Sequence, residues 1–501
     1  LTSTNSSIGL IYALKKILKS KKYRYTILMV VLGISASLRN KRFSYKNELV
    51  EDLKKIKNLE ELNVFVKNQI KITFNDIEKL NNKKLSFEEK YKQLKKHKGN
   101  RGLSNSETAL VYALWNSLQE NKIEIDYLSL SNIFENESKE KLDHFKKKFL
   151  NCNAIILSGP VYFGDRGSLT QRMIEFLNSD QECMRHAKKI IYAGLAVGAK
   201  RNGGQETTLI FQAMDFLNLG CKVIGNGHDT TAQYGGTIVA GDIGKAVEDD
   251  YGIKTALSTG KNLGEVLNNL NLNENIINQQ SSKPHKCSIF ILQDNKEEEC
   301  TKIITSLLKN YKKKDIIFKV FKVFKEEVHK CIACDVCPIS YAESEKYRCI
   351  INNKNDFFKK KHSEIIDCDS FIFAAYSGTN FVNIRTNYQQ FIERTRYLRR
   401  DNYLFGRKLV SSFIVSETNS NRNLHIRILT SLIRHHNILF KPILVFKNAN
   451  AYINLENIKK QFLDFCNTAL KVKNKIKESE YKPVGYEISL EEHLNRKKLT
   501  K

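Results

Sequence analysis

The chain has 501 residues and a formal net charge of +28. Its length exceeds what one ordinary core accommodates, so we expect two or three domains, and 41% hydrophobic residues suffice for globular folding. The longest apolar run, residues 25–34, falls short of the roughly 18–20 residues of a membrane helix, so we expect no membrane span.

The positive charge does not form one stripe, because the lysines are spread along the whole chain. No RNA-binding aromatic motif, zinc-finger spacing or basic zipper accompanies them, so we interpret the charge as solvated surface and expect no nucleic-acid partner. The first residues lack a secretory pattern, and the cysteine count of 11 is odd. We therefore expect a cytoplasmic protein with reduced thiols.

Short apolar runs predict strands in the first part of the chain, and amphipathic stretches separate them. The strand-like runs are 25–35, 123–130, 154–158, 190–197 and 222–225. Helical repeats cover 110–118, 169–177 and 209–217, and the last stops at Gly220. Strands alternating with helices predict a doubly wound parallel sheet.

Residues 40–101 interrupt this alternation with a polar, helix-like stretch. We expect an inserted helical hairpin that caps the first loop, and the alternative is a long surface excursion. Residues 269–286 form the clearest linker. After it the alternation restarts, with strand-like runs at 287–292, 316–324, 370–375, 408–415 and 438–446, and a charged tail follows at 476–501.

The first predicted strand ends in a segment suited to a phosphate. Gly33-Ile-Ser-Ala-Ser-Leu-Arg39 follows the strand, and Ser104-Asn-Ser106 comes directly before a helical pattern. Small hydroxyl residues, an arginine and a helix N-terminus all donate hydrogen bonds to a phosphate. Residues 40–45 are a rival for the second position. Neither an ATPase loop nor a dinucleotide fingerprint is present.

Two further strand ends carry distinctive loops, Gly159-Pro-Val-Tyr-Phe-Gly164 and Gly203-Gly-Gln-Glu206. These loops, in this order after a phosphate segment, resemble those of the flavodoxin-like NADPH-dependent FMN reductase superfamily. The resemblance covers residues 25–268. It differs in one respect, because residues 40–101 interrupt a phosphate loop that is usually continuous in that superfamily.

The resemblance implies that FMN binds to the first half and that NAD(P)H is the co-substrate. The FMN phosphate would be held by Ser35, Ser37, Arg39, Ser104, Asn105 and Ser106. The flavin ring would contact Pro160, Val161, Tyr162, Phe163, Gly164, Gly203 and Gly204. The alternative for Tyr162 is a packed core aromatic. We interpret His228 and Asp229 as loop residues, and no side chain is assigned a catalytic role.

Four cysteines gather in the second half, at Cys331, Cys334, Cys337 and Cys349. The first three have the C-x2-C-x2-C spacing that suits a [4Fe–4S] cluster, while zinc and unligated thiols remain alternatives. The segment resembles that of the iron–sulfur flavoproteins in the same superfamily, although the last gap is longer. Cys368 is the nearest substitute for the fourth ligand.

The second half lacks the phosphate features of the first. Its first strand is followed by Glu297, Glu298 and Glu299, whose carboxylates would repel a phosphate. We therefore expect two flavodoxin-like, doubly wound, parallel five-stranded sheets in tandem, with the helical insertion in the first. Residues 25–268 would bind FMN, and residues 287–475 would form a degenerate flavodoxin-like domain that binds the cluster.

The predicted function is an NAD(P)H-dependent FMN oxidoreductase that passes electrons through FMN and the iron–sulfur cluster to an unknown redox acceptor. The dimers of the superfamily suggest a homodimer. The alternatives are an FMN-dependent quinone or nitro reductase with a zinc-bound or unligated cysteine loop, a non-enzymatic electron-transfer flavoprotein, and a nucleic-acid or scaffold protein that uses the basic insertion.

Overall fold

The structure is a computed structural model. It describes residues 28–37, 48–81, 85–86, 88–89, 102–230, 232–269, 284–334, 347, 349–378, 384–400, 403–417, 423–449 and 451–472. The predicted tail and residues 270–283 of the predicted linker lie outside these residues, as does the start of the first predicted strand.

The strands of the first half form a parallel run around β1. They are β1 (Met29–Ser35), β2 (Ile123–Ser129), β3 (Ala154–Tyr162), β5 (Ile191–Gly198), β6 (Lys222–Val223) and β7 (Gly236–Val239). Their spatial order is β2-β1-β3-β5-β6, and β7 also pairs with β5. This order is the flavodoxin-like one. The strands are parallel, and the order in which they are added to the sheet reverses between β1 and β3.

Two details of the first half differ from the sequence prediction. β3 runs four residues beyond the predicted end at Ser158, because β4 (Asp165–Arg166) folds back and pairs with Val161 and Tyr162. The strand predicted at 222–225 is the two-residue β6, and β7, which the sequence pattern did not predict, also pairs with β5.

The strands of the second half repeat this order. They are β8 (His285–Gln293), β9 (Ile316–Phe321), β10 (Ser370–Ser377), β11 (Leu409–Glu417), β12 (Ile438–Leu439), β13 (Ile443–Asn448) and β14 (Ala451–Tyr452). The spatial order is β9-β8-β10-β11-β12, with β13 also against β11. The predicted strand 438–446 is split at Pro442, which has no N–H group for a sheet ladder.

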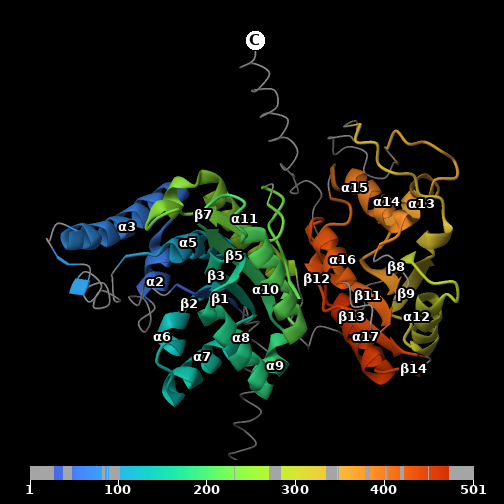
Figure 1. The fold of residues 1–501 in the computed structure, drawn as a ribbon, viewed down its shortest axis with the longest axis horizontal. Coiled ribbons are helices and arrows are strands. Elements are labelled where there is room, and N and C mark those ends of the chain that lie inside the picture. Colours follow the sequence, from blue (N-terminus) through green and yellow to red (C-terminus); the bar gives the residue numbers. More distant parts are fainter. Residues whose placement is uncertain are drawn as a thin grey trace, which may run out of the picture.

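The two runs are joined into one sheet rather than forming the two separate sheets predicted. β6 and β12 pair antiparallel at a single position, Val223 with Leu439. Both are short edge strands, and an edge with unpaired backbone groups readily pairs with another edge. Figure 1 shows the first half, from blue to green, beside the second half, from yellow to red, with β12 facing the first half.

Helices cover both faces of the sheet. In the first half they are α2 (Glu48–Lys55), α3 (Leu59–Asn81), α5 (Asn105–Leu118), α6 (Leu130–Phe134), α7 (Lys139–Asn151), α8 (Ser168–Ser179), α9 (Gln181–Ala187), α10 (Gln205–Leu219), η1 (Lys245–Glu248) and α11 (Asp250–Asn269). In the second half they are α12 (Glu299–Asn310), η3 (Val323–Lys325), α13 (Phe357–Ile366), α14 (Thr386–Arg394), α15 (Arg396–Arg400), α16 (Leu424–Ile433) and α17 (Leu455–Ala469).

Each face of the sheet carries one apolar cluster that runs through both halves. Val31 of β1 belongs to the cluster under α2, α3, α5, α11, α12 and α17, whereas its neighbour Leu32 belongs to the opposite one. Such alternation follows from the two-residue period of a strand, and burial on both faces explains why the strands are continuous apolar runs.

The predicted helical insertion consists of α2 and α3 where the structure describes it. Leu49, Leu53 and Leu62 are fully buried in the first cluster. The Tyr112 hydroxyl of α5 donates to Asn63 Oδ1 at 2.7 Å, and the Trp115 indole donates to the Ile56 carbonyl at 3.1 Å. The described side chains of α2 and α3 thus pack into the core, so this part of the insertion is not a mere surface excursion.

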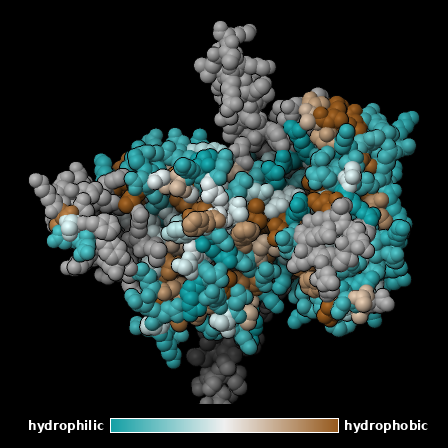
Figure 2. Space-filling view, viewed as in Figure 1, coloured by the Kyte–Doolittle hydropathy of each residue, from teal (hydrophilic) through white to brown (hydrophobic). Residues whose placement is uncertain are grey.

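Most of the face visible in Figure 2 is hydrophilic, with separate apolar patches. The charged outer sides of the amphipathic helices account for this distribution. Within the described residues, none of the helices combines the length and the apolar character that crossing a membrane requires.

Candidate functional site

Several predicted site residues meet at the carboxyl edge of the first-half strands. Ser35, the last residue of β1, lies opposite Ser129 of β2 and Ser158 of β3. Pro160 lies opposite Val197 near the end of β5. In a doubly wound sheet this edge, beside the reversal of strand order, is where ligands bind.

The helix α5 begins where the sequence predicted, at the second part of the phosphate segment. Ser104 is its N-cap and accepts a hydrogen bond from the Glu107 N–H, while the Glu107 carboxylate accepts one from the Ser104 N–H. Glu107 is buried and also accepts a hydrogen bond from the Tyr127 hydroxyl at 2.6 Å. The pKa of Tyr127 is raised well above its usual value. Burial is the largest cause, and the negative charge of the nearby Glu107 carboxylate is the second.

The remaining polar groups of this segment hold the loops together. The Ser158 hydroxyl donates to the Ser106 carbonyl at 2.7 Å, and the Ser37 N–H donates to the Ser35 hydroxyl oxygen at 3.3 Å. The Asn105 amide donates to the Asp242 carbonyl and accepts from the N–H of residue 246. Arg39 and the rival loop 40–45 lie outside the described residues.

The turn after β3 presents two aromatic side chains. Phe163 and Gly164 have φ angles of 52° and 79°, which is a tight turn with both central residues left-handed. Tyr162 is 48% exposed and Phe163 is fully exposed. The alternative of Tyr162 as a packed core aromatic is therefore wrong. A bulky residue with positive φ is strained, and such strain is typical of ligand-binding turns.

The two glycine-containing loops touch each other. A Cβ atom on Gly204, whose φ is +97°, would lie 2.6 Å from Gly164 Cα. A Cβ atom on Gly203 would lie 2.7 Å from the Lys200 carbonyl oxygen. Only glycine fits at these positions. The close approach of Gly204 to Gly164 brings the main chains of the two loops together at the edge of the sheet. The arrangement fits a flat ligand bound against the main chain.

His228 and Asp229 lie in the loop after β6, as predicted. The Ser258 hydroxyl donates to Asp229, and burial lowers the pKa of His228. Their neighbourhood includes the ion pair between Glu265 of the first half and Arg407 of the second. These residues belong to the junction of the halves.

The thiols of the predicted metal site differ from the other described cysteines. Cys331, Cys334 and Cys349 are partly exposed, whereas the seven others described are buried. All ten are free thiols, and Cys337 lies outside the described residues. Among the side chains that the structure describes, no group of three or more potential metal ligands is assembled. The donor chemistry fits iron or zinc, because both metals bind cysteine sulfur and these thiols are accessible.

Cys368, the suggested substitute ligand, is part of the core. Its thiol lies 3.5 Å from the Ile365 carbonyl, and burial raises the pKa of the thiol. A buried thiol of this kind resists the ionisation that metal binding requires.

Both ends of the cysteine segment, residues 331–349, are held by one buried ion pair. Arg394 donates to both carboxylate oxygens of Asp356, each at 3.0 Å, and both side chains are buried. Arg394 also donates to the His329 carbonyl and the Tyr347 hydroxyl, at 3.1 and 2.6 Å. His329 lies two residues before Cys331 and Tyr347 lies two residues before Cys349, so Arg394 contacts the chain near both ends of the segment.

The predicted phosphate segment of the first half lies between the end of β1 and the start of α5. At the corresponding place in the second half, between β8 and α12, a side chain of the protein itself is bound. Asp294, which follows β8, accepts hydrogen bonds from the N–H groups of Cys300 and Thr301 at the start of α12, at 3.1 and 2.9 Å. The predicted reason, repulsion by three glutamates, is incomplete, because Glu298 pairs with Lys322 and Glu299 pairs with Lys447. A carboxylate at a helix N-terminus takes the place of an anion.

Sequence reasoning missed the residues that organise both sites. Glu107 stands at the third helical position after Ser104, which is a capping-box signal visible in the sequence. Asp356 follows the cysteine segment in Asn-Asp-Phe and caps α13. Its partner Arg394 is 38 residues away, and no local pattern indicates such a pairing.

Comparison with known proteins finds a relative that matches about a third of the chain. An iron–sulfur flavoprotein of Methanocaldococcus jannaschii is 33% identical over 174 residues, which cover 32% of this chain and 89% of that protein. No protein-family model matches the chain.

Solved structures resemble the chain only distantly. A flavone reductase is 14% identical with a TM-score of 0.28, and the match covers 48% of this chain and 63% of that one. An NADH:FMN oxidoreductase is 10% identical with a TM-score of 0.28, and the match covers 48% of this chain and 89% of that one. The relationship rests on the sequence match, and by that match the chain belongs to the iron–sulfur flavoprotein family.

Proposed function

We propose that the protein is an NAD(P)H-dependent oxidoreductase with FMN in its first half and a [4Fe–4S] cluster in its second. The family relationship supports both cofactors. The observation that carries the flavin proposal is Phe163, a fully exposed aromatic with a left-handed backbone at the ligand edge of the sheet. Exposure and strain both cost free energy, and a bound ring system would compensate for them.

In this proposal the flavin ring lies against residues 160–164 and the glycines 203 and 204. The contact between Gly204 and Gly164 keeps side chains out of this space. The phosphate would be held by Ser35, Ser37, Arg39, Ser104 and Ser106, near the first turn of α5. The Asn105 amide would act by tying the loop at 242–246 to α5. When bound, FMN supplies hydride and single-electron chemistry.

The cluster ligands in this proposal are Cys331, Cys334, Cys337 and Cys349. The partial exposure of the described three supports the assignment, as does the spacing of the first three. Arg394 and Asp356 would hold the two ends of the segment at a set separation, and the Arg394 guanidinium would offset part of the thiolate charge.

The two halves are proposed to descend from one duplicated unit. The shared strand order supports this, since each half is arranged 2-1-3-4-5 in its own numbering of parallel strands. Each half has lost one function in this view. Asp294 takes the place of the phosphate in the second half, and the first half has no cysteine segment after β2.

The flavin proposal is tested by replacing Phe163 with alanine in the full-length chain. The matched control is Ile453→Ala, which removes another exposed apolar side chain, 61% exposed, from the second half. We expect the Phe163 variant to retain less FMN after gel filtration and to oxidise NADPH or NADH with ferricyanide more slowly. Equal flavin content and equal rates in the two variants would contradict the assignment.

The same preparations distinguish the alternatives. A quinone or nitro reductase with an unligated or zinc-bound loop would contain flavin without iron. A non-enzymatic electron carrier would contain both cofactors but would not oxidise NAD(P)H at a catalytic rate. Flavin, iron and sustained NAD(P)H oxidation together are the result that the proposal predicts.

A further inference from the structure

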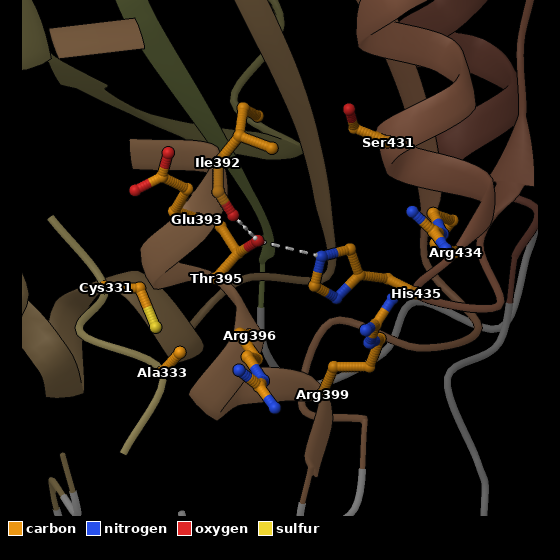
Figure 3. Close-up of a pocket in the computed structure, with 10 residues that line it drawn as sticks. All are labelled: Cys331, Ala333, Ile392, Glu393, Thr395, Arg396, Arg399, Ser431, Arg434 and His435. Atoms are coloured by element: carbon orange, nitrogen blue, oxygen red, sulfur yellow. Dashed lines mark hydrogen bonds between the residues drawn. The ribbon is translucent and has the colours of Figure 1, made fainter. Parts of the chain in front are cut away.

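Basic side chains gather in a cavity of the second half and at the junction of the two halves. The cavity has a volume of about 340 Å³ and lies beside Cys331 and His435 (Figure 3). Two of the arginines that line it, Arg396 and Arg399, already interact with other groups of the protein. The basic residues of the junction are lysines, and their contacts leave their positive charge without a counter-charge.

Four lysines meet where β6 of the first half pairs with β12 of the second. Val223, which follows Lys222, lies opposite Leu439, and Lys441 comes two residues after Leu439. Two of the lysines belong to the first half and two to the second. We call them the junction lysines, and they are Lys188, Lys222, Lys441 and Lys471.

Hydrogen bonds and packing hold three of the junction lysines close together. The Lys222 ammonium donates to the Lys188 carbonyl, which connects β6 to the residue after α9. The Lys188 side chain lies against Gly220, where an added Cβ atom would be 3.0 Å from Lys188 Cγ. The Lys441 ammonium crosses the junction and donates to the Asn218 carbonyl at 3.1 Å. Lysines of both halves therefore converge on the chain segment between α10 and β6.

The charges of the junction lysines act on one another. Burial, followed by the charge of Lys188, lowers the pKa of Lys441. Burial lowers the pKa of Lys222 to about 8, with Cys221 opposing the shift and Lys471 adding to it. Burial also raises the pKa of the Cys221 thiol to about 12, so this thiol carries no negative charge near neutral pH.

No carboxylate pairs with any of the four ammonium groups in the part of the chain that the structure describes. Lys222 is 7% exposed, Lys441 and Lys471 are half-buried, and Lys188 is exposed. An ammonium group has three donors, so Lys222 and Lys441 keep donors beyond those that bind the carbonyls. Like charges at partly buried positions repel each other more strongly than in water, and a bound anion relieves this cost.

We propose that the junction lysines bind a phosphate group, either as free phosphate or as a phosphate monoester. A phosphate monoester carries a charge of about −1.5 to −2 near pH 7, so it offsets more positive charge than a carboxylate does. Lysine ammonium groups act as point charges with rotatable donors, which suits a tetrahedral dianion, whereas planar carboxylates match the fork of an arginine. Because each half contributes two lysines, the bound phosphate connects the halves.

This phosphate site is separate from the cofactor sites proposed above. The loops assigned to FMN follow the carboxyl ends of the first-half strands, whereas Lys222 lies opposite Ile191, the first residue of β5. The junction lysines therefore lie at the other edge of the sheet from the FMN phosphate. A failure of the flavin or cluster assignment would leave the junction site intact, and the reverse also holds.

The test is isothermal titration calorimetry of the full-length protein near neutral pH and at constant ionic strength. Saturating FMN is present, so that a phosphate site in the first half is already filled. The probes are inorganic phosphate, glucose 6-phosphate and acetate. We expect at least one of the two phosphates to bind about tenfold or more tightly than acetate, and which of them binds identifies the source. Equal affinity for all three probes, or no binding of either phosphate at millimolar concentration, overturns the proposal.

Matched variants locate the site. Lys441→Gln and Lys471→Gln each remove one junction lysine, and we expect each to weaken phosphate binding by about tenfold. Lys460→Gln is the control, because it removes the same charge from an exposed position on α17 and should leave binding unchanged. Equal affinity in these three variants contradicts the location.

Thermal unfolding gives a second measurement. Phosphate should raise the midpoint temperature of the wild-type protein and of Lys460→Gln more than that of Lys441→Gln, because a ligand stabilises the folded state in proportion to its affinity. The same rise in all of them overturns the assignment. If Lys441→Gln does not fold, Lys188→Gln, at an exposed position, is judged by the same two criteria.

Discussion

Asp356 and Arg394 form a bidentate ion pair in which both oxygens of the carboxylate accept from the guanidinium at 3.0 Å. The Asp356 carboxylate also accepts from the backbone N–H groups of His329 and Lys359, at 3.0 and 3.2 Å. The pair thus connects the start of the cysteine segment, the start of α13 and the end of α14.

We predict that Arg394→Met lowers the free energy of unfolding by about 3–5 kcal/mol, because it leaves a buried carboxylate without its counter-charge. Urea unfolding monitored by circular dichroism measures the change. The double variant Asp356→Leu/Arg394→Met should recover a large part of the loss, since it removes both buried charges.

The control for this prediction is an ion pair at the surface. Lys286 and Asp367 are 2.6 Å apart, but their side chains are 45% and 61% exposed. Lys286→Met should change the free energy of unfolding by no more than about 1 kcal/mol. A cost for Arg394→Met that equals the control would show that the pair has no structural role.

A separate prediction concerns iron. Arg394→Lys keeps the charge but cannot reproduce the four hydrogen bonds, so the ends of the cysteine segment should be held less firmly. We expect lower iron retention after anaerobic gel filtration than in the wild-type protein. Unchanged iron content would mean that the pair stabilises the fold without positioning the segment.

Gly204→Ala tests the contact between the two first-half loops. The added Cβ would lie 2.6 Å from Gly164 Cα at a left-handed backbone position, so the loops must separate. We predict that the Kd for FMN rises about tenfold or more, which corresponds to about 1.4 kcal/mol. Gly241→Ala is the control, because its Cβ would approach only the Ala199 carbonyl oxygen, at 3.4 Å. Fluorescence titration of the apoprotein gives both constants.

The cysteine assignments predict two different outcomes for serine replacements. Cys331→Ser should reduce the iron content and the broad visible absorption of the cluster, because it removes one of the proposed thiolate ligands. Cys368→Ser should retain iron, because its thiol is buried in the core. Loss of iron in the second variant with retention in the first would reverse the assignment.

We predict that Lys222, which is buried in β6 at the junction, makes the free energy of unfolding depend on pH. Burial lowers the pKa of this lysine to about 8 in the folded state, against about 10.4 for an unfolded chain. Between these values the unfolded state binds more protons, so the free energy of unfolding should rise as the pH rises from about 8 to about 10.4. Below the folded pKa the penalty is constant.

Lys222→Met removes the buried charge and should flatten this rise, while raising the stability at neutral pH by roughly 1–3 kcal/mol. Lys309→Met, which replaces an exposed lysine of α12, is the control. Chemical denaturation at a series of pH values measures both. A rise of the same slope in the Lys222 variant would assign it to another group.

The repeated strands could be predicted because strands buried on both faces leave continuous apolar runs, as in β1, β8 and β10. The junction could not, since β6 and β12 are two residues each and pair through backbone groups that any sequence provides. Pro442 is a local signal that would have divided the strand predicted at 438–446.

The candidate sites were predictable to a similar extent. Glycines and hydroxyl residues at strand ends indicate a phosphate or a close backbone approach, and the contact between Gly164 and Gly204 follows from that logic. Distant pairs such as Asp356 with Arg394, and the cavity around His435, depend on how helices far apart in the sequence pack. The repeat of apolar residues along a helix or strand does not indicate which distant helices pack against each other.

The division of the two cofactors between the halves is tested most directly by the flavin, iron and acid-labile sulfide content of anaerobically purified full-length protein. We expect about one FMN, about four iron ions and about four sulfide ions per chain. The Cys331→Ser variant should lose iron and keep its FMN. Protein that binds neither flavin nor iron, even after reconstitution, would contradict it.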